Sequence, residues 1–368
     1  MERRSNFTGN FMCLLLCVCL VSGALFCDEI IGEAFFKAVQ GVGALKNTAL
    51  NTEIAVNGNF SAELNSLFSP KGFGGGEYLK RDITETPEDI IELKAEAQKL
   101  YAGLSKSGGI KEQQLISGNT SYGVVQVNNK TDEEIDIKSL LNSKPSYGNI
   151  TKEEPYILVY HTHTTEGYEL LDKGWYSADY NSRTKDSAKN MIRVGEELVK
   201  YLEEAGFRVI HDKNIYDSSY NGAYSRSLVS VEKYLKKYPS IVLTLDVHRD
   251  AIHYDSGTKC KPTAVINGKK AAQVMIISGC EGDGVEDFPI WKNNLIFALS
   301  LQNAVSESYS GLMRPVFFCN RKYNMNVTPC SLLLEFGTDA NTLEEAVYSA
   351  ALVGESMGEM LNKELKGK

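Results

Sequence analysis

The chain has 368 residues, of which 43% are hydrophobic and 23% charged, so it can bury a large core and is not expected to be disordered. The net charge of −8, with no clustering of Lys and Arg into a stripe, argues against a nucleic-acid-binding protein. The length suits one large domain with an appendage, or two domains.

The N-terminus is typical of a targeting segment. Arg3 and Arg4 precede an almost unbroken apolar run from Phe11 to Phe26. This run is shorter than the roughly 20 residues of a membrane-spanning helix but has the length of a signal-peptide core. We therefore expect residues 1–27 to form a signal peptide or a short membrane anchor, and the rest of the chain to be extracytoplasmic, either secreted or membrane-anchored.

Residues 28–150 carry weaker signals and are expected to form a smaller, mixed N-terminal region. The Gly-rich stretch 69–76 has no preceding strand and no following Lys-Ser/Thr, so it is interpreted as a hinge and not as a phosphate loop. A helix is expected over 87–104 and a strand over 122–127, followed by a turn at 128–130. The polar stretch 142–152, which contains proline and glycine, is the expected boundary before a catalytic domain at 151–368.

From residue 155 onward, predicted strands and helices alternate, which favours an α/β fold with a largely parallel sheet flanked by helices. The strands are expected at 156–160, 207–210, 241–247, 273–278 and 331–336, and the helices at 186–205, 225–238, 289–308 and 342–361. Four cysteines fall in this region without a C-x-x-C pair, which makes a cysteine zinc site improbable and leaves a disulfide optional.

Three of the predicted strands end in polar residues that burial would otherwise disfavour. The first delivers His161, His163 and Glu166, the second His248, and the third Glu335. Imidazole nitrogen and carboxylate oxygen are good zinc ligands, and two histidines with one glutamate leave a fourth position for water in catalytic sites. The pattern predicts a zinc site with His163, Glu166 and His248 as ligands and Glu335 as a catalytic acid–base group.

Other ligand sets fit the same pattern. His161 shares a face with His163 on an extended segment, so His161 is an alternative ligand or an outer residue that supports the site. His253 is a further alternative if the spacing differs from the one assumed.

Non-catalytic interpretations of the same residues remain open as well. Glu335 could form a core ion pair with Arg249, and Asp246 is expected to orient His248 as an outer partner. Each histidine, taken alone, could simply be a hydrogen-bonded structural residue.

Several separate motifs, in this order along the chain, resemble the stage II sporulation protein P family. They are Tyr160-His-Thr-His-Thr-Thr-Glu166, Gly222-Ala-Tyr-Ser-Arg226, Asp246-Val-His-Arg-Asp250, Trp291-Lys-Asn-Asn294 and Leu333-Leu-Glu-Phe-Gly-Thr-Asp-Ala-Asn-Thr-Leu343. The resemblance runs from about residue 155 to the C-terminus, with a weaker similarity over 125–141.

The resemblance implies a fold and activity related to the zinc-dependent N-acetylmuramoyl-L-alanine amidases of the cell wall. It implies cleavage of the bond between MurNAc lactyl and L-alanine in peptidoglycan, with stem-peptide endopeptidase activity also attributed to the family. It further implies action during forespore engulfment, with a membrane anchor and partner engulfment proteins. A non-catalytic wall-binding scaffold is the alternative outside the enzymes.

By the same resemblance, His163 and His248 match the two metal histidines of the wider amidase family, and Glu335 matches the catalytic glutamate. The wider family takes its ligand glutamate from the start of the helix that is expected here near 186, where this chain has Ser187. The nearest carboxylate to His163 is Glu166, which we therefore expect to be the third ligand.

Overall fold

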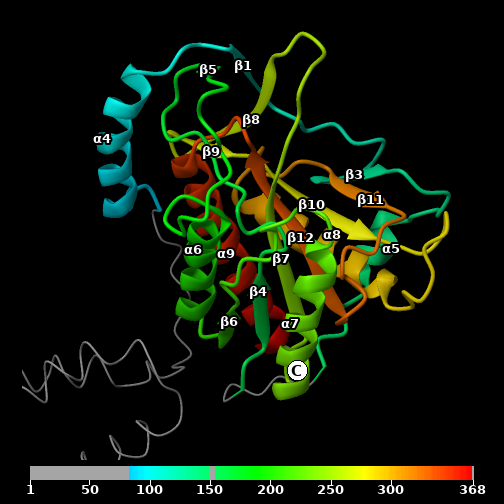
Figure 1. The fold of residues 1–368 in the computed structure, drawn as a ribbon. Helices are drawn as coiled ribbons and strands as arrows, with labels where there is room; N and C mark the ends of the chain where they lie inside the picture. Colours follow the sequence, from blue (N-terminus) through cyan, green and yellow to red (C-terminus); the bar gives the residue numbers. More distant parts are fainter. Residues whose placement is uncertain (1–82, 149–153, 367–368) are drawn as a thin grey trace, which may run out of the picture. The chain divides into compact units, whose positions relative to one another are not determined.

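The computed structural model describes residues 83–148 and 154–366 (Figure 1). The chain divides into two compact units, residues 1–74 and 75–368, and all described residues belong to the second. The predicted leader at 1–27 lies outside the described residues. The division falls within the Gly-rich stretch 69–76, and the boundary expected at 142–152 falls inside the second unit.

An eight-stranded sheet forms the centre of this unit, in the order β2-β3-β11-β10-β12-β7-β4-β6. Most neighbours are parallel, but β2–β3 and β10–β12 are antiparallel, so the predicted α/β class is confirmed with a mixed sheet. The strands are β2 (Thr120–Tyr122), β3 (Val125–Asn129), β4 (Ile157–Tyr160), β6 (Val209–His211), β7 (Leu243–Asp250), β10 (Val274–Gly279), β11 (Val316–Cys319) and β12 (Cys330–Thr338).

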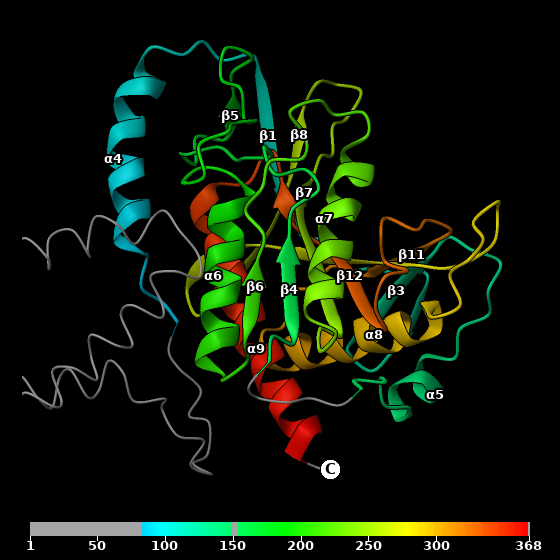
Figure 2. The ribbon, with the colours of Figure 1, turned by 60° about the horizontal axis from the view of Figure 1, so that its bottom comes forward.

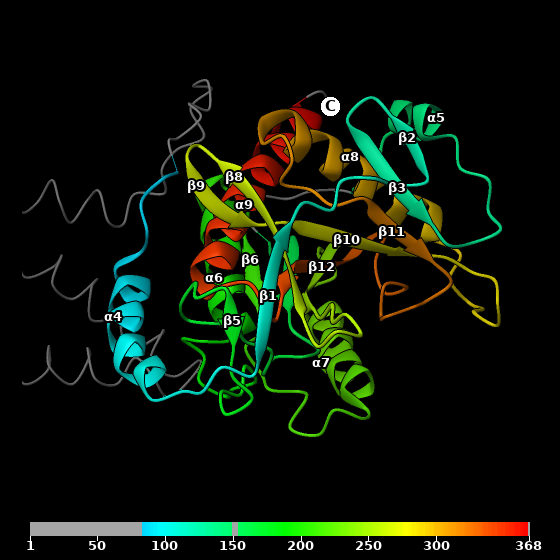
Figure 3. The ribbon, with the colours of Figure 1, turned by 90° about the horizontal axis from the view of Figure 1, so that it is seen from above.

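Helices cover both faces of this sheet (Figures 2 and 3). One face packs against α6 (Met191–Glu204), α8 (Trp291–Ser308) and α9 (Leu343–Lys366), which form the main hydrophobic core with residues such as Ile157 and Val159. The other face packs against α7 (Ala223–Lys237), where Leu158 and Tyr160 meet Val231. The alternation of side chains along β4 therefore supplies apolar contacts to both layers.

The helix start expected near 186 is placed differently by the structure. α6 begins at Met191, because the Asn190 side chain accepts a hydrogen bond from the Ile192 backbone N–H and caps the first turn. Residues 184–189 instead form turns, in which Asp186 accepts from the Ala188 N–H. The predicted end of the helix is confirmed, since α6 finishes at Glu204, just before Gly206.

A second, four-stranded sheet has the order β5-β1-β8-β9, and none of its strands was predicted. Its strands are β1 (Gly108–Gln113), β5 (Trp175–Tyr176), β8 (Lys259–Ile266) and β9 (Lys269–Ala272). β1 pairs in parallel with β8, and β3 pairs in parallel with β11. Residues before the expected boundary at 142–152 thus contribute strands to both sheets.

Two further helices and a hairpin belong to this early segment. The predicted helix over 87–104 is confirmed as α4 (Glu88–Ala102), and α5 (Ile137–Asn142) is short. The single strand expected over 122–127 is instead the hairpin β2–β3, whose turn uses Gly123 at φ +59°. In residues 83–148 and 154–366, no helix is both long and apolar enough to cross a membrane.

Candidate active site

The candidate site lies toward the carboxyl ends of β4, β7 and β12, on the face of the sheet that packs against α7. Along β7, Leu243, Leu245 and Val247 enter the main core, so the alternating residues, including Asp246 and His248, project to the opposite face. His248 is paired in register with Glu335 on β12, which places both side chains on that face. Glu335 lies within its strand, as expected, and His248 also lies within β7, because this strand continues to Asp250 and does not end at Val247 as predicted.

A tight turn after β4 carries the other two candidate ligands. The Glu166 backbone N–H donates to the His163 carbonyl at 3.0 Å, which closes the turn. Asp246 on the neighbouring β7 anchors the turn, because its two carboxylate oxygens accept from the Thr162 backbone N–H at 2.8 Å and the Thr162 hydroxyl at 2.7 Å. A buried carboxylate therefore joins the two strands that present the site.

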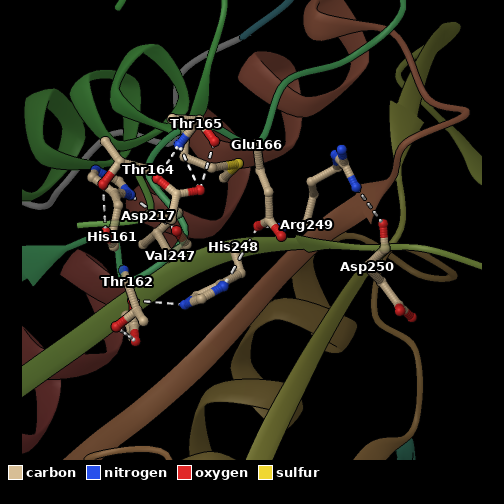
Figure 4. A network of polar contacts seen from close by, with 12 residues as sticks. His161, Thr162, Thr164, Thr165, Glu166, Asp217, Val247, His248, Arg249 and Asp250 are labelled. Carbon is tan, nitrogen blue, oxygen red and sulfur yellow. Dashed lines mark hydrogen bonds and ion pairs between the residues drawn. The ribbon is translucent and has the colours of Figure 1, made fainter. Parts of the chain in front are cut away.

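His248 is the centre of the cluster (Figure 4). Its Nδ1 lies 3.5 Å from Glu166 Oε2, and its Nε2 lies 2.8 Å from Asp246 Oδ1. The contact with Asp246 is an ion pair, and Nε2 has no hydrogen-bond partner among the described residues. The ring of His163 meets that of His248 edge to face, with 5.3 Å between centroids.

The charges of this cluster are strongly coupled. Burial opposes the charge on His248, but Asp246 and Glu166 outweigh burial and raise the pKa of His248 well above its usual value. Burial would raise the pKa of Glu166, yet its contact with His248 and the nearby charge of Arg249 lower that pKa to about 2. The site therefore favours a cation in contact with an ionised Glu166.

Glu335 has a different environment. Its Oε2 atom is buried and makes no hydrogen bond within the described residues. Burial raises the pKa of Glu335 to about 8, and His248 only partly opposes this effect. The core ion pair with Arg249 is not found in the described residues, because the Arg249 guanidinium donates instead to the Gly167 and Asp250 carbonyls and to the Ser182 hydroxyl.

His161 points away from the cluster (Figure 4). Its Nδ1 lies 2.9 Å from the Val247 carbonyl oxygen and its Nε2 lies 2.8 Å from Nε2 of His211. A carbonyl only accepts, so His161 Nδ1 donates to it, and His161 Nε2 accepts from His211. Burial lowers the pKa of His161 to about 4, which keeps the ring neutral. With both nitrogens engaged, His161 is not positioned as the alternative ligand.

His253, the other alternative ligand, is also placed elsewhere. It is bonded to Asp339, with 2.9 Å between Nε2 and Oδ2. The Asp339 carboxylate also pairs with Lys259 at 2.7 Å. His253 therefore belongs to a separate ion-pair group.

Residues that the sequence did not single out surround the candidate ligands. Arg183 donates to Glu166 Oε1 at 3.1 Å and to Asp217 Oδ2 at 2.9 Å. Tyr220 stacks on His163, and Tyr224 lies parallel to His248 with 6.3 Å between centroids. Tyr224 stands in one of the motifs that carry the family resemblance, which was a usable signal. Arg183 and Asp217 had no such signal.

The residues present fit a zinc ion in their chemistry. His163 Nδ1, His248 Nε2 and Glu335 Oε2 are buried side-chain atoms without a hydrogen-bond partner in the described residues, although such atoms are normally satisfied. The imidazoles of His163 and His248 and the carboxylate of Glu166 are a donor set of the kind that binds zinc, and Glu335 is paired in register with His248. Within residues 83–148 and 154–366, no three His, Cys, Asp or Glu side chains are arranged so that they could hold a metal ion together. Glu166 and His248 contact each other directly.

Known proteins similar to this chain agree with the motifs. Stage II sporulation protein P of Bacillus subtilis (strain 168) is 30% identical over 222 residues, which cover 57% of this chain and 52% of the relative. The chain thus spans about half the length of the curated relative that it matches.

Among solved structures, the amidase AmiC2 of Nostoc punctiforme has 11% identity and a TM-score of 0.35, and the comparison covers 59% of this chain and 99% of that one. The CwlD amidase from Clostridioides difficile, solved with the GerS lipoprotein, has 14% identity, a TM-score of 0.35, and covers 56% and 99%. The sequence model of stage II sporulation protein P (SpoIIP) matches residues 76–358, and the chain therefore belongs to the SpoIIP family.

Proposed function

We propose that this chain is a zinc-dependent peptidoglycan hydrolase that cleaves the amide bond between MurNAc and L-alanine during forespore engulfment. Membership of the SpoIIP family supports the sporulation role. Two observations carry the enzymatic proposal: His163 Nδ1, His248 Nε2 and Glu335 Oε2 are buried without a hydrogen-bond partner among the described residues, and Glu166 contacts His248. Buried polar atoms are costly to leave unsatisfied, so a site that retains three of them is expected to have a bound partner.

His163, Glu166 and His248 would hold the zinc ion. When bound, zinc supplies a Lewis acid that polarises the scissile carbonyl and lowers the pKa of water. Asp246 anchors the turn that carries His163, because its carboxylate accepts from the Thr162 backbone N–H. Arg183 holds Glu166 Oε1, which orients the carboxylate from the side away from His248.

Glu335 is the proposed acid–base group. Its unpartnered Oε2 takes a proton from the attacking water and delivers it to the amine nitrogen that leaves. Burial raises the pKa of this carboxyl group, which favours the return of the proton to the leaving nitrogen. The lactyl carbonyl carbon of MurNAc gains the water oxygen, and its bond to the L-alanine nitrogen breaks as the proton reaches that nitrogen.

The test is digestion of purified peptidoglycan by the purified protein, with and without a chelator. Mass spectrometry of the products identifies the bond that is cut. Free stem peptides that begin with L-alanine support the amidase, whereas cuts within the stem peptide identify a zinc endopeptidase. Intact peptidoglycan with zinc present would leave a non-catalytic wall-binding scaffold, and a reaction that the chelator does not slow would contradict the zinc site.

The location and partners belong to the same proposal. The apolar run at 11–26 supports an extracytoplasmic protein that is attached to the membrane or secreted, and the family suggests other engulfment proteins as partners. Protease added to intact protoplasts should digest the protein. Full protection would contradict this orientation.

A further inference from the structure

Tyr220 is a largely exposed aromatic residue that covers one of the candidate ligands. Its ring stacks on the imidazole of His163 with 4.6 Å between centroids and 2° between planes. Tyr220 keeps 64% of its surface exposed, whereas His163 is buried. Because Tyr220 itself buries little apolar surface, hydrophobic stabilisation of the fold does not account for this contact.

The loop that carries Tyr220 is held at two points. The Arg226 guanidinium, on the first turns of α7, donates to three backbone carbonyls of residues 216–221, including that of Tyr216 at 2.6 Å. Asp217 accepts from the backbone N–H of Thr165 at 3.0 Å and from its hydroxyl at 2.6 Å. The loop is thus tied both to α7 and to the turn between the two candidate ligands.

Arg183 connects the same loop with Glu166. Its guanidinium carbon lies 5.5 Å from the centre of the Tyr220 ring, within the range of a cation–π contact. One guanidinium nitrogen pairs with Asp217 at 2.9 Å and another with Glu166 at 3.1 Å. Loop 216–221 therefore reaches both ligands of the turn, Glu166 through Arg183 and His163 through Tyr220.

His163 also contacts Tyr224 in an edge-to-face arrangement, with 5.5 Å between centroids and 83° between planes. The two tyrosines together confine the imidazole, and Tyr220 forms the side that faces solvent. Without the Tyr220 ring, the imidazole could rotate outward, and zinc binding would have to restrict that rotation again.

We propose that Tyr220 is a positioning residue that stacks on His163, holds its imidazole beside His248 and thereby tightens zinc binding. This inference rests on the proposed zinc site. Tyr220→Ala should bind zinc about 2- to 12-fold more weakly, which is the range expected from the loss of one aromatic pair. Tyr220→Phe keeps the ring and should bind zinc as the unmodified protein does.

The experiment measures zinc affinity of the full chain by competition with a chromophoric chelator, and the absorption spectrum of the cobalt-substituted protein. Tyr122→Ala is the matched control, because Tyr122 is also exposed, at 46%, but lies on the edge strand β2. We expect weaker zinc binding and an altered cobalt spectrum only in Tyr220→Ala, with a thermal midpoint equal to that of the control variant when both are measured with chelator.

Each other outcome overturns a defined claim. Unchanged zinc affinity in Tyr220→Ala overturns the positioning role alone. A thermal midpoint that falls together with zinc affinity also overturns it, since the residue would then be structural. Absence of zinc binding by the unmodified protein overturns the proposed function, and the positioning role with it.

Discussion

Replacement of Glu335 by glutamine separates proton transfer from metal binding. The amide keeps the shape of the side chain but cannot take the proton from water. Loss of general acid–base catalysis typically lowers the rate by about 10²- to 10⁴-fold. Because Glu335 is not a proposed ligand, Glu335→Gln should retain about one equivalent of zinc, as expected for a single three-ligand site.

The structure also gives this substitution an effect on stability. The pKa of Glu335 is about 8 in the folded protein, against an ordinary value of 4.5. Below pH 4.5 the carboxyl group is protonated in both the folded and unfolded states, so folding carries no penalty. As the pH rises toward 8, only the unfolded state loses the proton, and the free energy of unfolding decreases. Between pH 4.5 and 7, deprotonation of this group in the unfolded state lowers the free energy of unfolding by about 3 kcal/mol. Glu335→Gln has no titrating group at this position and should not show this decrease.

The assays are peptidoglycan hydrolysis, elemental analysis, and urea unfolding at both pH values with chelator present. Glu92→Gln, at an exposed position on α4, is the control for a simple loss of one carboxylate. Near-normal hydrolysis by Glu335→Gln would refute the acid–base role, and loss of zinc would make Glu335 a ligand. If the free energy of unfolding depends on pH in the same way in Glu335→Gln and in the unmodified protein, Glu335 is not a buried carboxyl group with a raised pKa.

Three further substitutions test other parts of the structure. Glu166→Gln should lose zinc together with hydrolysis, because a neutral amide is a much poorer zinc ligand than a carboxylate; elemental analysis measures this. Tyr101→Phe removes the hydroxyl that donates to the buried Glu169 at 2.5 Å, and should lower the unfolding free energy by about 1–3 kcal/mol in urea titrations. Gly195→Ala should lower it by about 1–3 kcal/mol, although alanine normally favours a helix interior, because the added Cβ would lie 2.6 Å from the His161 ring.

These substitutions have matched controls. For Tyr101→Phe the control is Tyr122→Phe on the exposed hairpin, which should leave stability unchanged. For Gly195→Ala it is Gly103→Ala, where the nearest atom to an added Cβ is 3.7 Å away. Zinc retention in Glu166→Gln would place the third ligand outside the turn after β4. If Tyr101→Phe is as stable as its control, the hydrogen bond to Glu169 does not stabilise the fold. If Gly195→Ala is as stable as its control, the close approach to His161 does not exclude a Cβ.

The local sequence was enough to predict the elements that have a strong hydrophobic pattern or that end at a proline or glycine. The apolar run of β4, the helix stopped before Pro239 and the α/β class follow from residues close together in the chain. The same local reading brought attention to His163, Glu166 and His248, because polar residues at the ends of buried strands are unusual. The sequence could not predict, however, which of their nitrogen and oxygen atoms have hydrogen-bond partners.

The tertiary structure decided what depends on contacts between distant residues. β1 and β8 lack a strand pattern in the sequence, and they form strands by pairing with each other and with β5 and β9. Residues 83–148 belong to the same unit as the site. His161 and His163 are two residues apart and chemically alike, yet hydrogen bonds from distant residues turn His161 away from the cluster. Short-range patterns encode propensity and alternation, but pairing and side-chain orientation depend on partners supplied by the rest of the fold.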